Sequence, residues 1–170
     1  MINDVVRNIL RFIFLVLFQV LILNNIQLSG YLNPFLYVLF ILMLPFRTPD
    51  WLVLILAFVL GISVDLFSDT GGLHAAASVL LAFLRQPVLR LVSPREGYDV
   101  NQHPTLKQFG IGWFFTYAGL LVFVHHLFLF YMEAFRFSEF FSTFFRVVLS
   151  SSFTLALIFI SQFFFSKHKA

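Results

Sequence analysis

Long apolar runs, separated by short polar turns, occupy almost the whole chain. Of its 170 residues, 60% are hydrophobic and 11% are charged, whereas an ordinary soluble domain carries about 25% charged residues. So few charged side chains cannot coat a soluble surface of this size. The sequence therefore predicts a single integral membrane domain covering 1–170. The fold class should be all-α, because helices satisfy their own backbone hydrogen bonds in lipid.

The apolar runs predict a polytopic protein with six transmembrane helices. We expect them at about residues 5–23, 33–46, 50–67, 72–92, 108–132 and 140–165. The second run is the weakest, since at 1.5 Å per residue it reaches only about 21 Å across a hydrocarbon core of roughly 30 Å. It must therefore recruit flanking residues, thin the bilayer or be partly sheltered by neighbouring helices. The first run is interpreted as a retained signal-anchor, because no small-x-small cleavage site follows it.

The basic residues predict the orientation of these spans. With the N-terminus inside, nine of the 11 lysines and arginines fall on the inner side: Arg7, Arg11, Arg47, Arg85, Arg90, Arg95, Lys107, Lys167 and Lys169. Cytoplasmic loops carry such an excess, so both termini should lie inside. The net charge of +3 then indicates contact with anionic lipid headgroups rather than nucleic acid.

The polar turn at residues 61–74, GISVDLFSDTGGLH, lies between two apolar runs. Asp69 or Thr70 is expected to cap the following helix by presenting an oxygen to its free N–H groups. Gly71 and Gly72 allow a tight reversal, so the preceding helix should end near residue 67 or 68. This pattern predicts a corner between the third and fourth spans.

Asp65 is the unexplained member of that corner. An ionisable side chain at membrane depth is costly, and the His74 side chain, one turn into the next helix, is its expected partner. Three readings remain open: a structural corner, a site for a small ligand or partner helix, and a catalytic or metal site. His125 and His126 should lie on the same side as His74, either as a pH-sensitive or metal-binding cluster or as ordinary interfacial residues.

Small residues predict where helices approach each other most closely. Such residues let transmembrane backbones come together, and they concentrate in two clusters: Ala75, Ala76, Ala77 and Ser78, and then Ser150, Ser151 and Ser152.

Other charged residues should lie near headgroups or form ion pairs. Arg85 and Arg90 are expected to extend towards the headgroups, and Arg136 and Arg146 to pair with Glu133 and Glu139.

Cysteine is absent, which excludes disulfides and thiolate chemistry. The sequence contains no nucleophile elbow, HExxH motif or phosphate-binding loop, so we expect neither an enzyme nor a cofactor.

The corner also carries a family resemblance. Its residues are Gly61, then Asp65-Leu66-Phe67-Ser68, Gly72-Leu73-His74, the alanines 75–77, and Arg85 and Arg90. With a basic N-terminus and about 170 residues, this pattern resembles the bacterial rod shape-determining protein MreD family. The candidate structural or partner-binding corner comprises Gly61, Asp65, Asp69, Gly71, Gly72 and His74.

The resemblance implies a scaffold in the bacterial inner membrane. Family members belong to the elongation complex that builds lateral-wall peptidoglycan. They associate with the bitopic protein MreC and, with it, with RodA, its penicillin-binding transpeptidase and, indirectly, MreB. The family is also similar in fold to the S-components of energy-coupling-factor transporters. The alternative expectation is therefore a small-ligand-binding transporter subunit.

Overall fold

A computed structural model describes residues 2–25, 32–99, 102–135 and 139–166 of the chain. Within these ranges the chain is helical, with no β-strand. The α-helices are α1 (Ile2–Leu21), α2 (Leu39–Leu42), α3 (Asp50–Ser68), α4 (Leu73–Leu91), α5 (Leu106–Ala134) and α6 (Phe140–Ser166), and the 3-10 helices are η1 (Leu23–Asn25) and η2 (Leu36–Val38).

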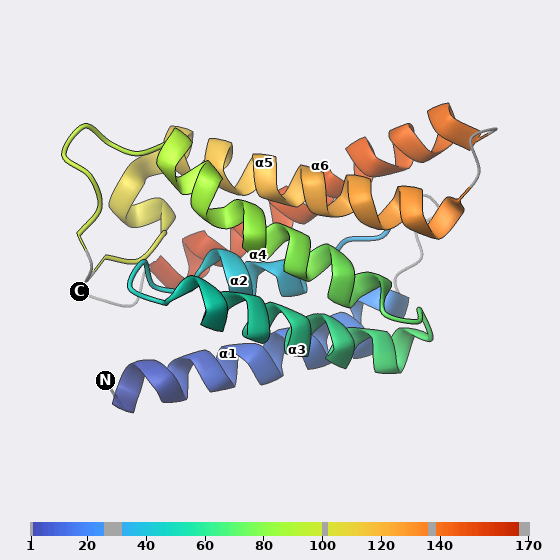
Figure 1. Ribbon diagram of the computed structural model, residues 1–170, viewed down its shortest axis with the longest axis horizontal. Coiled ribbons are helices and arrows are strands. Elements are labelled where there is room, and N and C mark those ends of the chain that lie inside the picture. The colour runs from blue at the N-terminus through green and yellow to red at the C-terminus, as the bar shows by residue number, and fades with distance from the viewer. Residues whose placement is uncertain (1, 26–31, 100–101, 136–138, 167–170) are drawn as a thin grey trace.

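The long helices lie side by side along one common direction (Figure 1). One end of the bundle, called here the corner end, holds the turn between α3 and α4. The opposite end, called the loop end, holds the start of α3 and the loop between α4 and α5. The beginning of α1 and the end of α6 both lie at the loop end (Figure 1).

Four of the described helices are long and apolar enough to cross a membrane: the segment Val5–Asn25, then α3, α5 and α6. This is a membrane protein by the length and composition of its helices. Helix α4 is as long as α3 and packs against both α3 and α5. It is less apolar, however, because its sequence contains Arg85, Gln86 and Arg90. The prediction of six crossings therefore remains a prediction for α4 and for the second segment.

The second segment differs from the expected continuous helix at 33–46. Residues 33–35 form no helix, and helical structure covers only Leu36–Leu42, divided between η2 and α2. Tyr37, Val38, Ile41 and Leu42 are completely buried. The helix prediction for 33–46 was wrong because this segment lies inside the bundle, where other helices supply hydrogen bonds that a transmembrane helix must otherwise make for itself.

Candidate functional site: the corner and the buried second segment

The Asp65 carboxylate caps helix α4 from the end of α3. Its Oδ2 accepts a hydrogen bond from the Ala75 N–H at 2.8 Å, and its Oδ1 accepts from the His74 N–H at 3.0 Å. The Thr70 hydroxyl also donates to Oδ1, and Asp65 is only 5% exposed. The first N–H groups of a helix have no partner within it, and the positive end of its dipole favours a carboxylate.

This arrangement corrects two predictions about the corner. Asp69 and Thr70 do not cap α4: its N-cap is Gly72, which has no capping side chain, and the cap comes from Asp65. The partner of Asp65 on His74 is the backbone N–H, not the imidazole. Proximity across the hairpin was predicted correctly, but the atoms that meet were not.

The turn itself follows the sequence closely. Helix α3 ends at Ser68, and Asp69 adopts a left-handed conformation with φ 54°, its N–H donating to the Asp65 carbonyl at 3.0 Å. Gly71 and Gly72 have φ of 59° and 96°, which glycine adopts without steric cost. The predicted reversal at the glycine pair is confirmed.

Gly61 allows α3 and α4 to touch backbone to backbone. A Cβ at Gly61 would lie 2.3 Å from the Ala75 Cα, far inside van der Waals contact. Ala75, Ala77 and Ser78 are buried on α4, but Ala76 is exposed. Three of the four predicted contact residues on α4 therefore face into the bundle.

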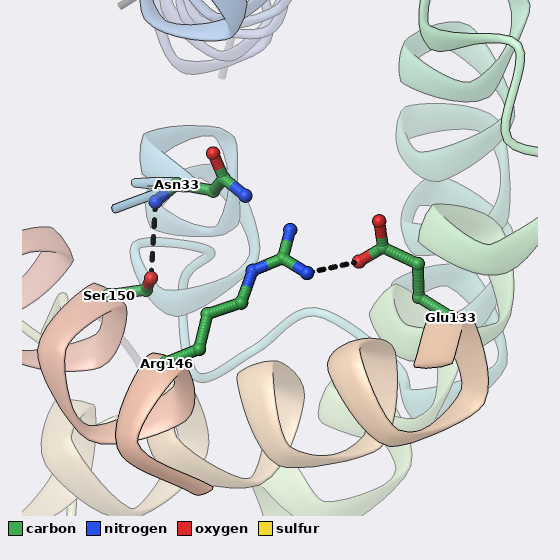
Figure 2. A network of polar contacts seen from close by, with 4 residues as sticks. All are labelled: Asn33, Glu133, Arg146 and Ser150. Carbon is green, nitrogen blue, oxygen red and sulfur yellow. Dashed lines mark hydrogen bonds and ion pairs between the residues drawn. The ribbon is translucent and has the colours of Figure 1, made fainter. Parts of the chain in front are cut away.

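The three serines of α6 that were predicted as helix contacts differ in their exposure. Ser150 and Ser151 are buried, and the Ser150 hydroxyl accepts from the Asn33 N–H at 3.1 Å (Figure 2). Ser152 is exposed and donates to the Val148 carbonyl of its own helix. It lies on the outward side of α6, so it makes no contact inside the bundle, and contact with a partner helix stays a prediction.

Two histidines share the hydroxyl of Tyr37 in the core. The Tyr37 oxygen lies 2.9 Å from His74 Nδ1 and 2.8 Å from His125 Nε2. A hydroxyl has one proton to donate and can accept in return, so it can bridge two neutral rings with one bond in each direction. The rings of Tyr37 and His74 lie edge to face.

His126 has its ring orientation set by backbone and hydroxyl groups. Its Nδ1 lies 2.8 Å from the Val122 carbonyl, which can only accept, so Nδ1 carries the proton. Its Nε2 accepts from the Thr154 hydroxyl at 3.1 Å, and that hydroxyl accepts from the Phe35 N–H at 3.0 Å. His125 and His126 are both fully buried, so the interfacial reading of this pair was wrong.

The described part of the chain contains no group of three or more histidine, cysteine, aspartate or glutamate side chains placed to hold a metal ion. The histidines instead contact tyrosine and threonine hydroxyls or backbone. Their arrangement orients the second segment between α4, α5 and α6.

The corner-end part of the second segment is held by side chains from α1 and α6. Gln19 donates to the Pro34 carbonyl and accepts from the Leu36 N–H, each at 2.9 Å. The Phe35 and Asn33 N–H groups go to Thr154 and Ser150, as described above. Non-helical backbone at membrane depth is tolerated only where such partners exist.

The opposite part of the segment is held by Arg85 and Tyr117. Arg85 Nη2 donates to the Leu44 carbonyl, its Nε donates to the Tyr117 hydroxyl at 3.2 Å, and that hydroxyl donates to the Leu42 carbonyl at 3.0 Å. These carbonyls follow or end the short helix α2, where backbone acceptors lack helical partners. Arg85 is 1% exposed, so its predicted extension towards headgroups was wrong. Arg90 is exposed, as expected.

Sequence reasoning missed the polar residues that hold the second segment. The available signal was that each lies inside a predicted apolar span: Gln19, Tyr37, Tyr117 and Thr154. The sequence does not reveal that Gln19, Tyr117 and Thr154 all form hydrogen bonds to the backbone of the second segment. Nor does it reveal that Tyr37, within that segment, contacts two histidines.

A cavity of about 370 Å³ opens at the corner end of the bundle. Its polar lining includes Asn24, Asn33, Thr70, His74, Glu133 and Arg146. Arg146 Nη1 lies 3.3 Å from Glu133 Oε2 (Figure 2), and its guanidinium lies 4.3 Å from the centre of the Phe130 ring. The expected Arg146 ion pair is thus confirmed with Glu133, whereas Arg136 lies outside the described residues.

In comparisons with known proteins, no family model, curated protein or solved structure matches this chain. The MreD resemblance therefore depends on the sequence motif between residues 61 and 90.

Proposed function

We propose that this chain is a non-enzymatic scaffold subunit of the bacterial cell-elongation complex in the inner membrane. It would bind MreC and connect RodA and its penicillin-binding transpeptidase, and indirectly MreB, to maintain cell shape. The observation that carries this proposal is that Gly61, Asp65, His74 and Ala75, which define the family-like motif, join α3 to α4 through backbone contacts.

The hydrogen bonds of Asp65 favour a structural role over a chemical one. Both carboxylate oxygens accept from groups at the start of α4 or from Thr70. Protonation of this carboxylate, as in general base catalysis, would weaken the cap of α4. A rigid corner of this kind suits a protein whose task is to present fixed surfaces to partners.

The second segment supports the same reading. Its irregular backbone is fixed by side chains from α1, α4, α5 and α6, which links most of the bundle into one unit. We infer six crossings with both termini in the cytoplasm, in an arrangement similar to transporter S-components. The common position of the described ends of α1 and α6 and the distribution of basic residues support this topology.

The proposal is tested by depleting the protein in its own rod-shaped cell and following shape and lateral-wall labelling. Depletion should produce rounded cells with lateral insertion lost, and re-expression should restore both. Cells that stay rod-shaped with normal lateral insertion after complete depletion would refute the proposal.

A second candidate function, a small-ligand-binding transporter subunit, is favoured by the cavity at the corner end. That cavity is polar, partly walled by the Arg146–Glu133 pair, and within the size range of small-molecule sites. This candidate requires a small molecule that co-purifies with the protein and an associated ATPase module. Tight ligand binding without MreC association would favour it over the scaffold.

A further inference from the structure

The corner-end cavity of about 370 Å³ carries one positive and one negative side chain in its wall. Arg146 and Glu133 are the only charged side chains among the described residues that line it. Glu133 is the next-to-last residue of α5, and Arg146 lies roughly 9 Å along α6 from its first residue. Both charges are therefore close to the end of the bundle, at the depth of lipid headgroups.

The ion pair between these two side chains is loose. Arg146 Nη1 lies 3.3 Å from Glu133 Oε2, whereas a charge-assisted hydrogen bond of this kind is about 2.7–2.9 Å long. The two side chains are 25% and 41% exposed, and ion pairs that are open to solvent contribute little to stability. A ligand can therefore insert between the two charges at small cost.

The Arg146 guanidinium is positioned by a contact that leaves its N–H groups available. It lies 4.3 Å from the centre of the Phe130 ring, and the face of a ring attracts the cation without accepting from its N–H groups. Of its five N–H donors, one points to Glu133. A second is accepted by the Asn33 amide oxygen, in the amide orientation that its surroundings favour. Figure 2 shows the Arg146 side chain between these two residues.

His74 adds a buried group with one unused ring nitrogen. His74 is only 4% exposed and lines the same cavity. Its Nδ1 contacts the Tyr37 hydroxyl. Its Nε2 has no hydrogen-bond partner among the described residues, and it is not fully enclosed as the unpaired Nδ1 of His125 is. This nitrogen can donate to or accept from a ligand, depending on the tautomer.

The neighbouring polar side chains of the lining are already engaged within the chain. The Asn24 amide bonds to the side chains of Gln19 and Ser68, and the Thr70 hydroxyl donates to the carboxylate that caps α4. Unused hydrogen-bonding capacity is therefore concentrated in the ion pair and the His74 imidazole.

We propose that the corner-end cavity binds a zwitterionic group, with its anionic part against Arg146 and its ammonium against Glu133. An anion without an ammonium would be repelled by Glu133, and a cation without an anionic part would be repelled by Arg146. Apolar residues complete the lining, among them Val20, Leu23 and Leu129, and they suit an apolar extension of the ligand. Two sources carry this chemistry: the aminoethyl phosphate headgroup of phosphatidylethanolamine, and a free apolar amino acid.

The site goes beyond the scaffold function and does not require it. With phosphatidylethanolamine as occupant, it adds a lipid to the scaffold. With a free amino acid as occupant, it supplies the substrate class of the second candidate function, the transporter subunit.

Competition between lipids tests the first source. The purified full chain in detergent is given equal amounts of phosphatidylethanolamine, phosphatidylglycerol and monoglucosyl diacylglycerol with identical acyl chains, whose headgroups are zwitterionic, anionic and neutral. Native mass spectrometry then measures which lipid stays bound. Phosphatidylethanolamine should exceed each of the others by roughly tenfold, the ratio expected for one charge-assisted contact.

Calorimetric titration with leucine tests the second source. Isocaproate, which lacks the ammonium of leucine, and isoamylamine, which lacks its carboxylate, are the matched controls. If the occupant is a free amino acid, leucine should bind roughly tenfold more tightly than either control.

A charge variant separates a specific site from general lipid or ligand binding. Glu133→Gln removes the partner of the ammonium, so phosphatidylglycerol or isocaproate should then bind at least as well as the zwitterion. Arg95→Gln and Glu96→Gln, at exposed positions of the loop between α4 and α5, should leave the preference unchanged. Because each preference is a ratio within one preparation, it can be measured even if Glu133→Gln lowers the yield.

The two arms also identify the occupant. A zwitterion preference among the lipids assigns the site to phosphatidylethanolamine, and one in the leucine titration assigns it to a free amino acid. No zwitterion preference in either arm, or a preference that Glu133→Gln leaves intact, would overturn the proposal. Neither result bears on the scaffold, which depends on MreC co-purification.

Discussion

Replacing Asp65 by asparagine should destabilise the whole bundle, because this carboxylate is the cap of α4. Asparagine keeps one acceptor oxygen, but its amide nitrogen would replace Oδ2, which accepts from the Ala75 N–H at 2.8 Å. Two donors would then face each other. The bonds from His74 N–H and Thr70 to Oδ1 would also lose their charge assistance.

The magnitude follows from these losses. A hydrogen bond to a charged group contributes about 1.5–3 kcal/mol, and a buried N–H left without a partner costs about 1–3 kcal/mol. Allowing for partial relaxation, Asp65→Asn should lower the free energy of unfolding by roughly 3 kcal/mol. At about 2–4 °C per kcal/mol for a domain of this size, the Tm in detergent should fall by roughly 6–12 °C.

Asp69→Asn is the matched control for this measurement. Asp69 is exposed and left-handed with φ 54°, a conformation that asparagine adopts readily, so its change should stay within about 0.5 kcal/mol. The assay is thermal unfolding of both purified variants beside the wild type. Equal Tm values for Asp65→Asn and Asp69→Asn would refute the capping argument.

Three further substitutions, one of them with a control, test contacts between the helices by the same thermal-unfolding assay. Gly61→Ala should lower the free energy of unfolding by about 3 kcal/mol or prevent accumulation of the protein, because its Cβ would meet the Ala75 backbone at 2.3 Å. A variant with the Tm of the wild type would show that α3 and α4 can move apart at little cost. Arg85→Ala should lower the free energy of unfolding by about 3 kcal/mol, because carbonyls of the second segment lose their partner. Arg90→Ala, at an exposed position, is the control and should be close to neutral; equal falls in Tm for the two variants would contradict this role of Arg85. Tyr37→Phe should lower the free energy of unfolding by about 2 kcal/mol, since the hydroxyl bridges two buried imidazoles. An unchanged Tm would show that these hydrogen bonds do not stabilise the protein.

The features that follow from local sequence were predicted well. The membrane class, the end of α3 at Ser68 and the glycine reversal at Gly71 and Gly72 depend on hydropathy and on backbone preferences of neighbouring residues. A close helix contact at Ala75 was also anticipated, because small residues let transmembrane backbones approach each other, but its counterpart Gly61 on α3 was not.

The features that depend on distant partners were not predicted. Phe35 and Thr154, whose backbone–side-chain bond helps to hold the second segment, are separated by 119 positions in the chain, and Leu44 and Arg85 by 41. Hydropathy alone predicts a weak helix for the second segment. It also predicts that a basic side chain near a helix end, such as Arg85, extends to the headgroups. Only the packed bundle shows that Arg85 and Thr154 replace the missing helical hydrogen bonds.

The proposed scaffold role requires that this chain bind MreC in the membrane. Affinity purification of the tagged full-length chain from its own membranes, with mass spectrometry of proteins and small molecules from the same sample, tests that claim most directly. The account predicts MreC in stable stoichiometric amounts, with RodA and its transpeptidase beside it. A tightly bound small molecule and an ATPase module, with MreC absent, would contradict it.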